Sequence, residues 1–317
     1  MASPSHHSPL VIVAGPTAGG KSRVALAIAQ AFDGVVINAD SMQVYRELRL
    51  LTARPSIEDE VRIPHRLFGC LSATERCSAG RWRHLALTEI AAARENNRMP
   101  IVVGGTGLYL GALTAGLAPV PDIPEGIRVE AQTLYDRLGG PAFRERLAIR
   151  DPIAANRLSP TDRTRLLRAW EVIEATDVTL STWHKSTSGG LAEPVSAIVL
   201  TPPRDLLYQA IDARFDTMMA SGAMEEVRKL LDLQLNPELP AMKALGVREI
   251  ASHLAGALTL EAASAAAKQA SRHYAKRQLT WLRHHKISEI SYSTQFPEKN
   301  LDEILSFIRQ RGLTGQA

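Results

Sequence analysis

The first part of the chain alternates short apolar runs with longer stretches that have helical spacing. The predicted elements are strands at 10–14, 35–38 and 101–103 and helices at 22–32, 79–96 and 108–114. Strands that alternate with helices are typical of a parallel sheet covered by helices on both faces. We therefore predict an α/β fold with such a sheet at its core.

The pattern changes at 118–126, where the sequence "APVPDIPEG" is rich in proline and marks a boundary. The following stretch is helical and basic up to about residue 182, and Ser159, three residues before Asp162, predicts a helix N-cap there. An apolar run at 196–200 then restores the α/β alternation. The predicted domains are a core made of 1–117 and 194–317 and an inserted helical arm at 118–193.

A further helix is predicted at 204–221, with Gly222 as its stop. Its apolar face carries Arg214 in the middle. A buried arginine is costly unless it is paired. The pattern alone leaves two interpretations open: an internal ion pair, or a guanidinium that points into a phosphate site.

The composition is that of an ordinary globular protein, with 45% apolar and 22% charged residues in 317. No apolar stretch approaches the roughly 20 residues that a membrane span needs. Cys70 and Cys77 match no metal-binding spacing, so we expect reduced thiols in a cytoplasmic protein. We expect a monomer with no membrane partner.

The net charge of +4 alone does not indicate a partner, but the distribution of basic residues does. The stretch 262–288 contains basic residues and no acidic one: Lys268, Arg272, Lys276, Arg277, Arg283 and Lys286. On a helix all but Arg277 share one narrow stripe, and Arg277 points the other way, toward the core or the active site. The stripe is either a solvated face or a surface for a polyanion, and its single sign favours the polyanion.

A glycine-rich stretch, "GPTAGGKS", lies at 15–22 between the first predicted strand and the helix that follows. Gly15, Gly20, Lys21 and Ser22 have the spacing of a phosphate-binding loop. Backbone N–H groups of such a loop wrap phosphate oxygens, the lysine neutralises charge, and the serine hydroxyl is a ligand for Mg²⁺. The strand before it and the helix after it make a chance glycine-rich turn a poor explanation.

A hydrolytic nucleotidase should also have an apolar strand that ends in a Mg²⁺-binding aspartate. The strand at 101–103 runs into "GGTG" instead, and Leu110 excludes a dinucleotide fingerprint there. The strand at 35–38 leads to Asp40. At the carboxyl edge of a parallel sheet, near a phosphate loop, Asp40 is predicted to be either a metal-side acid or a general base.

Nine segments resemble, in order, those of the bacterial tRNA dimethylallyltransferases, from about residue 10 to 285. They are "GPTAGGKS", "INADSMQVYR", "TARPS", "PHRLF", "VGGTGLY", "DPIAANRLSPTDRTRLLRAWEV", "RFDTMMASGAMEEV", "ALGVREI" and "YAKRQLTWLR". The resemblance implies a core like that of P-loop NTPases. It also implies transfer of a dimethylallyl group from dimethylallyl diphosphate to N6 of the adenine 3′-adjacent to the anticodon, in tRNAs that read codons starting with U.

The resemblance also implies residue roles. The phosphate loop would hold the donor diphosphate with Mg²⁺, so the phosphate is a leaving group. The implied donor site consists of Gly15, Pro16, Thr17, Ala18, Gly19, Gly20, Lys21 and Ser22, with Ser22 as the metal ligand. The implied catalytic residues are Asp40, as the base toward the adenine amine, with Thr17, Lys21 and Arg214.

The tRNA partner would be held at its anticodon stem-loop. The implied or predicted tRNA contacts are Asp40, Ser41, Met42, Gln43, Thr106, Arg128, Thr164, Arg165, Leu166, Leu167, Arg168, Lys243, Arg248, Arg272, Lys276 and Arg277. The sequence departs from the family pattern at four positions, Thr161, Thr164, Ala210 and Val247. Val247 stands where an aromatic residue is usual, which would alter base stacking.

Two other classes of function fit part of the pattern. A small-molecule kinase would bind ATP in the phosphate loop and use Asp40 to position a hydroxyl, but it has no need of a basic arm and a basic helix. A non-catalytic RNA-binding protein would have no need of Lys21, Ser22 and Asp40 together. A GTPase would show an Asn-Lys-x-Asp segment, which the sequence lacks.

Overall fold

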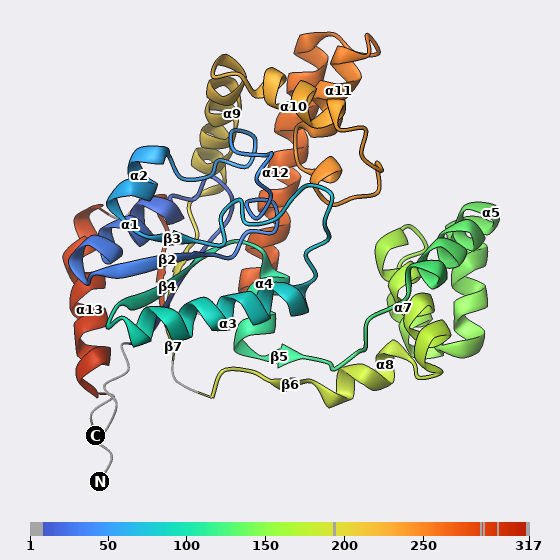
Figure 1. Ribbon diagram of the computed structural model, residues 1–317, viewed down its shortest axis with the longest axis horizontal. Helices are drawn as coiled ribbons and strands as arrows, with labels where there is room; N and C mark the ends of the chain where they lie inside the picture. The colour runs from blue at the N-terminus through green and yellow to red at the C-terminus, as the bar shows by residue number, and fades with distance from the viewer. Residues whose placement is uncertain (1–8, 193–194, 286, 288, 297, 315–317) are drawn as a thin grey trace. The chain divides into compact units, whose positions relative to one another are not determined.

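The computed structural model describes residues 9–192, 195–285, 287, 289–296 and 298–314 (Figure 1). The chain divides into two compact units. The first consists of Met1–Leu113 with Ala192–Ala317, and the second is Thr114–Leu191. The proline-rich stretch at 118–126 therefore falls just inside the second unit.

The first unit is built on a six-stranded parallel sheet with the order β3-β2-β4-β1-β7-β8. Its strands are β1 (Leu10–Ala14), β2 (Gly34–Asn38), β3 (His65–Arg66), β4 (Met99–Gly104), β7 (Val195–Leu200) and β8 (Ile290–Tyr292). β1, β2 and β4 are buried along their whole length, because helices cover both faces of the sheet. The predicted parallel α/β fold is confirmed.

Helices α1 (Lys21–Ala31) and α13 (Leu301–Thr314) cover one face of this sheet (Figure 1). Alternate strand residues, among them Val11 and Val13, pack against Ile28 of α1 and Ile304 of α13. Helix α3 (Ala79–Glu95) contacts β2 and β4 from the other face. The predicted helices at 22–32 and 79–96 are confirmed within about a residue of their ends.

The other helices of the first unit follow the carboxyl ends of the strands. They are α2 (Ile57–Arg62), α4 (Gly107–Thr114), α9 (Arg204–Ala220), α10 (Ala223–Asp232), α11 (Val247–Leu254) and α12 (Leu260–His284). The predicted stop at Gly222 is confirmed, since this glycine has φ 105° between α9 and α10. The basic helix begins at Leu260 and ends at His284. Lys286, which is predicted to belong to the basic stripe, lies outside the described residues.

The second unit has its own apolar core. It contains α5 (Glu125–Arg150), α6 (Pro152–Arg157), α7 (Arg163–Thr176), α8 (Leu180–Trp183) and the short strands β5 (Gly116–Leu117) and β6 (Ser188–Gly189). The long helix α5 is broken at Gly139, whose φ is 74°. The expectation that Ser159 caps a helix is wrong: Asp162 caps α7 by accepting the N–H of Arg165, while the Ser159 hydroxyl pairs with Thr161.

Candidate active site

The phosphate loop joins the end of β1 at Ala14 to the start of α1 at Lys21. The N–H of Gly19 donates to the carbonyl of Pro16 at 3.0 Å, which closes the turn. Gly20 has φ 86°, and a Cβ there would lie 1.8 Å from the carbonyl oxygen of Gln295. Only glycine fits this position, and the loop therefore presents its backbone N–H groups at the N-terminus of α1.

Lys21 points back into this loop, where its Nζ donates to the carbonyl of Pro16 at 2.7 Å. Burial lowers the pKa of Lys21 to about 8; the Asp40 carboxylate raises this pKa and the Arg214 guanidinium lowers it. An anion in the loop would favour the charged ammonium. Ser22, the next residue, is exposed in the first turn of α1.

Asp40 follows β2 and is held by its neighbours. Its N–H donates to the Asn38 Oδ1 at 2.7 Å, and the Asn38 amide donates to the Asp40 carbonyl at 2.9 Å. The Asp40 Oδ1 accepts the N–H of Met42 at 2.9 Å. Among the described residues no further hydrogen bond occupies the Asp40 Oδ2, so this oxygen can accept a proton from a ligand.

Arg214 reaches the phosphate loop from the middle of α9. Its Nη2 donates to the Thr17 Oγ1, and no carboxylate among the described residues forms a salt bridge with it. Burial lowers the pKa of Arg214, and the Asp40 carboxylate partly offsets that effect. A guanidinium desolvated in this way gains most from an anionic ligand beside it. The geometry thus favours the phosphate interpretation of Arg214 over the internal ion pair.

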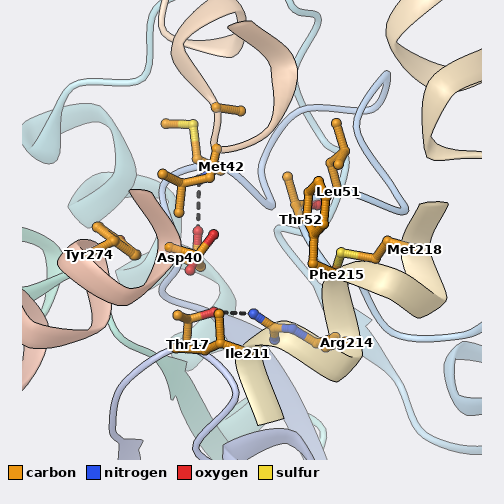
Figure 2. Close-up of a pocket in the computed structure, with 13 residues that line it drawn as sticks. Thr17, Asp40, Met42, Leu51, Thr52, Ile211, Arg214, Phe215, Met218 and Tyr274 are labelled. Carbon is orange, nitrogen blue, oxygen red and sulfur yellow. Dashed lines mark hydrogen bonds between the residues drawn. The ribbon is translucent and has the colours of Figure 1, made fainter. Parts of the chain in front are cut away.

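A pocket connects these groups (Figure 2). Thr17, Asp40 and Arg214 line its polar part. The apolar lining comes from the loop after β2, from α9 and from the residues before α11, and consists of Met42, Leu51, Ile211, Phe215, Met218, Ala244 and Leu245. Thr52, with Ser271 and Tyr274 of α12, completes the wall. Such a pocket suits a ligand with an anionic head and a short apolar chain.

Helix α12 supplies two side chains whose contacts the sequence did not reveal. The buried amide of Gln278 accepts the N–H of Thr17 at 2.7 Å and donates to the carbonyl of Gly105 at 2.9 Å. Gln278 therefore ties the phosphate loop to the loop after β4. The Tyr274 hydroxyl pairs with Thr106, and burial raises the pKa of this tyrosine well above its usual range.

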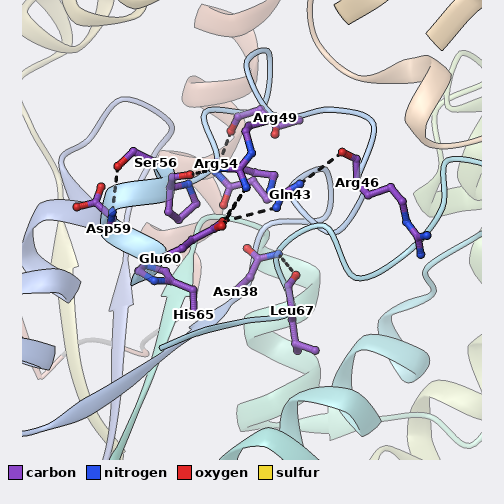
Figure 3. A network of polar contacts seen from close by, with 12 residues as sticks. Asn38, Gln43, Arg46, Arg49, Arg54, Ser56, Asp59, Glu60, His65 and Leu67 are labelled. Atoms are coloured by element: carbon purple, nitrogen blue, oxygen red, sulfur yellow. Dashed lines mark hydrogen bonds and ion pairs between the residues drawn. The ribbon is translucent and has the colours of Figure 1, made fainter. Parts of the chain in front are cut away.

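The segment after Asp40 forms the rim of the pocket. The Ser41 N–H donates to the Thr106 Oγ1 at 3.0 Å, which explains why two distant predicted tRNA contacts lie together. Met42 lines the pocket. Gln43 is not one of the pocket-lining residues, and its amide donates to the carbonyls of Thr52 and Ala53 at 2.8 and 3.0 Å. Figure 3 labels Gln43 in the polar network of this loop, near Arg54 and Glu60. Gln43 is thus a loop anchor.

The basic residues of α12 do not form one continuous stripe of unpaired charges. Lys268 pairs with Asp216 of α9 at 2.6 Å, and the guanidinium of Arg272 pairs with Asp212 of the same helix. Lys276 and Arg283 are exposed. Of the two directions predicted for Arg277, the core is wrong, because Arg277 is exposed. Its guanidinium lies 5.6 Å from the centre of the ring of Tyr274, which lines the pocket.

In the second unit the predicted tRNA contacts differ in exposure. Thr164 and Arg165 are exposed at the start of α7, and Arg165 pairs with Asp162 at 3.1 Å. Arg168 is partly buried next to Glu171 at 3.9 Å, and burial lowers the pKa of this arginine. The remaining members of the set are Arg128, which donates to the carbonyl of Ile123 at 3.2 Å, the half-buried Leu167, and Leu166. The side chain of Leu166 is 0% exposed in the core of the unit, so the predicted tRNA contact at this position stays a prediction for its backbone alone.

The residues around "KALGVR" lie on both sides of the start of α11. Lys243 is exposed and pairs with Glu238 at 2.7 Å, and Arg248 is exposed on the helix. Val247 is 1% exposed. It therefore packs in the interior, and the expectation that a valine at this position alters base stacking stays a prediction.

The fold and the site are those of a phosphate-loop protein with a carboxylate and an apolar pocket beside the loop. The chain belongs to the IPP transferase family, whose pattern it matches over residues 43–285; it also matches the isopentenyl transferase family over residues 8–76.

Curated relatives cover almost the whole chain. The tRNA dimethylallyltransferase of Rhodospirillum centenum is 58% identical over 280 residues, which is 87% of this chain and 88% of the relative. That of Paramagnetospirillum magneticum is 50% identical over 311 residues, 98% of this chain and 99% of the relative.

Solved structures are also similar. The tRNA isopentenylpyrophosphate transferase of Bacillus halodurans is 33% identical with a TM-score of 0.69, and 97% of each chain is covered. A eukaryotic dimethylallyltransferase solved acting on tRNA is 26% identical with a TM-score of 0.76, covering 96% of this chain and 77% of its own. None of the helices in the described part of the chain is long and apolar enough to cross a membrane.

Proposed function

We propose that this protein transfers a dimethylallyl group from dimethylallyl diphosphate to N6 of an adenine in tRNA and releases diphosphate. The adenine is the one 3′-adjacent to the anticodon in tRNAs that read codons starting with U. The observation that carries the proposal is the pocket in which Thr17 of the phosphate loop, Asp40 and Arg214 meet an apolar wall. The names of the relatives are consistent with it.

The phosphate loop suits a diphosphate that leaves. Breaking the allylic C–O bond builds positive charge on carbon and additional negative charge on the departing oxygen. Lys21 and Arg214 both reach the phosphate loop, so they and the loop N–H groups that have no partner within the described residues would stabilise the developing charge. The apolar lining, with Ile211 and Phe215, would hold the five-carbon group.

Asp40 is the proposed general base. The lone pair of the adenine amine is delocalised into the ring, so the amine is a poor nucleophile until a proton leaves. The Met42 N–H fixes one oxygen of Asp40, and the second oxygen can take the N6 proton as the new C–N bond forms. Attack and proton transfer then proceed together without a free amide anion.

The described residues fit a Mg²⁺ ion that binds together with the diphosphate and is held mainly by it. They contain no cluster of three or more carboxylate, histidine or cysteine side chains that could hold a metal. The exposed Ser22 hydroxyl in the first turn of α1 is the one ligand that the loop motif supplies. Mg²⁺ keeps several waters and commonly binds through substrate phosphates; when bound, it would neutralise charge on the leaving diphosphate.

The second unit and the rim of the pocket are the proposed tRNA-binding surfaces. The target adenine must leave the anticodon-loop stack to reach Asp40, and contacts with the RNA backbone have to offset that cost. Exposed positive groups suited to this are Arg165 in the second unit and Lys276, Arg277 and Arg248 in the first. Ser41 and Thr106 would lie beside the extruded base.

Lys276→Ala should lower the slope of log tRNA affinity against log salt by up to about 1, because its exposed ammonium can neutralise a phosphate. Lys268→Ala, a matched change on the same helix, should leave the slope unchanged, because Lys268 pairs with Asp216. Filter binding over a salt series measures both. A Lys276→Ala slope equal to that of wild type would remove Lys276 from the RNA-binding surface.

Donor binding should weaken as the pH rises above about 8, where the free enzyme loses the Lys21 proton. The direction follows from the lowered pKa: between about 8 and 10.5 the unfolded chain holds a proton on Lys21 that the folded chain has lost. The free energy of unfolding therefore rises with pH in this window, while Lys21 loses the positive charge that would bind the diphosphate. Measurements of kcat/KM for the donor from pH 6.5 to 9.5 should show the fall. Lys21→Arg, which stays protonated, should show a flat profile over the same range, and a fall of equal size in that variant would exclude Lys21 as its cause.

Titration with two ligands tests the proposed function against a kinase. Dimethylallyl diphosphate with Mg²⁺ should bind, and it should raise the temperature of unfolding in proportion to its affinity. ATP should bind more weakly, because the apolar lining leaves its base and ribose without matched hydrogen-bond partners. Tight binding of ATP without binding of the prenyl diphosphate would favour the kinase.

A further inference from the structure

A carboxylate outside the pocket holds three successive backbone N–H groups of the loop after β2. The Glu226 Oε2 accepts the N–H groups of Arg49 and Leu50 at 2.8 and 2.7 Å, and its Oε1 accepts the N–H of Leu51 at 2.9 Å. Hydrogen bonds to a charged acceptor are about twice as strong as neutral ones. This contact joins segments about 175 residues apart in the chain.

The anchored loop is one wall of the pocket. Leu51 and Thr52 line the pocket directly, next to Phe215 and Met218 of α9 (Figure 2). A Cβ at Gly246 would lie 3.0 Å from the Leu51 Cδ2 and 3.3 Å from the Phe215 Cε2. Leu51 and Phe215 therefore converge on the backbone at Gly246 and close this apolar end.

The position of Glu226 links the loop that carries Leu51 to the helix that carries Phe215. Glu226 lies in the first turn of α10, which begins at Ala223 directly after α9 and Gly222. The same helical hairpin thus carries Phe215 and Met218 and the carboxylate that holds Leu51. Gln43 anchors the far side of the loop through the carbonyls of Thr52 and Ala53, and the left-handed φ of 52° at Ala53 needs such support.

We propose that Glu226 is a positioning residue that fixes Leu51 and thereby limits the length of the prenyl chain that the enzyme accepts. The inference rests on the proposed function, since it takes the apolar end of the pocket as the site of the prenyl chain. With Leu51 held, the pocket ends near Gly246 and fits five carbons. With Leu51 released, its side chain can move away from Gly246, and the pocket then accepts a ten-carbon chain.

Glu226→Gln tests this, because an amide has one acceptor oxygen where the carboxylate has two. The amide oxygen of glutamine can still accept the N–H groups of Arg49 and Leu50. The amide NH₂ then faces the N–H of Leu51, and because both groups are donors, the hydrogen bond to Leu51 is lost. We expect the ratio of kcat/KM for geranyl diphosphate to that for dimethylallyl diphosphate to rise about tenfold or more, a change typical of altered apolar fit. Glu225→Gln is the matched control, since Glu225 is exposed and pairs only with Arg228 among the described residues.

Leu51→Ala should raise the same ratio, and Glu226→Gln combined with Leu51→Ala should add little to it, because both act on one wall. An unchanged ratio in Glu226→Gln, with equal losses on both donors, would overturn the proposal and leave Glu226 a structural residue. Should Glu226→Gln fail to fold, Glu226→Asp keeps the charge on a shorter side chain, and a wild-type ratio in that variant would overturn the proposal too. Labelling of tRNA by the wild-type enzyme is scored in the same assay, so a failure of the proposed function is seen separately.

Discussion

Asp40→Asn should lower the turnover of tRNA prenylation by about two to four orders of magnitude, the range typical of losing a general base. Asparagine keeps the side-chain oxygen that accepts the Met42 N–H at 2.9 Å, so the pocket should keep its shape. It cannot take the N6 proton. Donor binding at pH 7 should be nearly unchanged, and single-turnover kinetics with isothermal titration separate the two effects.

The same variant has a second, independent signature. The Asp40 carboxylate raises the pKa of Lys21, so its removal should shift the loss of donor binding to a pH below about 8. Asp33→Asn is the matched control, because Asp33 is exposed, does not line the pocket, and precedes β2 where Asp40 follows it. Full turnover in Asp40→Asn would exclude Asp40 as the base.

Arg214→Ala should lower kcat/KM for the prenyl donor by about two to three orders of magnitude, as expected for a lost electrostatic contact to developing charge. The Arg214 guanidinium donates to the Thr17 hydroxyl at the edge of the phosphate loop, which places it beside the leaving group. Affinity for tRNA should stay the same. Steady-state kinetics with each substrate varied in turn measure this split.

Thermal unfolding distinguishes this role from a structural one. Burial lowers the pKa of Arg214, so the apo protein bears a cost for holding the charge there. The variant should therefore unfold at a temperature equal to or above that of wild type when no donor is present. Arg228→Ala, at an exposed arginine of α10, is the control. A lowered unfolding temperature with intact catalysis would make Arg214 a structural residue.

The sequence predicted what is determined locally. The strand at 10–14, the phosphate loop and the helix after it are neighbours in the sequence. Their apolar runs and glycines favour the backbone conformation of the segment in which they lie. For the same reason the apolar face around Arg214 was visible from helical spacing alone. The parallel sheet followed from the alternation of these elements.

Contacts between segments that are distant in the chain could not be predicted from the sequence. Gln278 sits in a basic helix with nothing in its surroundings to show that its amide bridges the Thr17 N–H and the Gly105 carbonyl. Glu226 looks like an ordinary helix-start acid. The helical angles separated Arg277 from Lys268 and Arg272 correctly, but they could not show that Asp216 and Asp212 of α9 would pair with the latter two. Pairing depends on tertiary packing, which local patterns do not encode.

The nucleoside that receives the prenyl group shows whether the phosphate loop is a prenyl-diphosphate site. The purified protein is incubated with total tRNA, Mg²⁺ and dimethylallyl diphosphate labelled in the prenyl group, and the tRNA is then digested to nucleosides. We expect the label in N6-isopentenyladenosine, from the position 3′-adjacent to the anticodon of tRNAs that read codons starting with U, with one diphosphate released per label and no requirement for ATP. Unlabelled tRNA, or label in any other nucleoside, would contradict the assignment of the phosphate loop as a prenyl-diphosphate site.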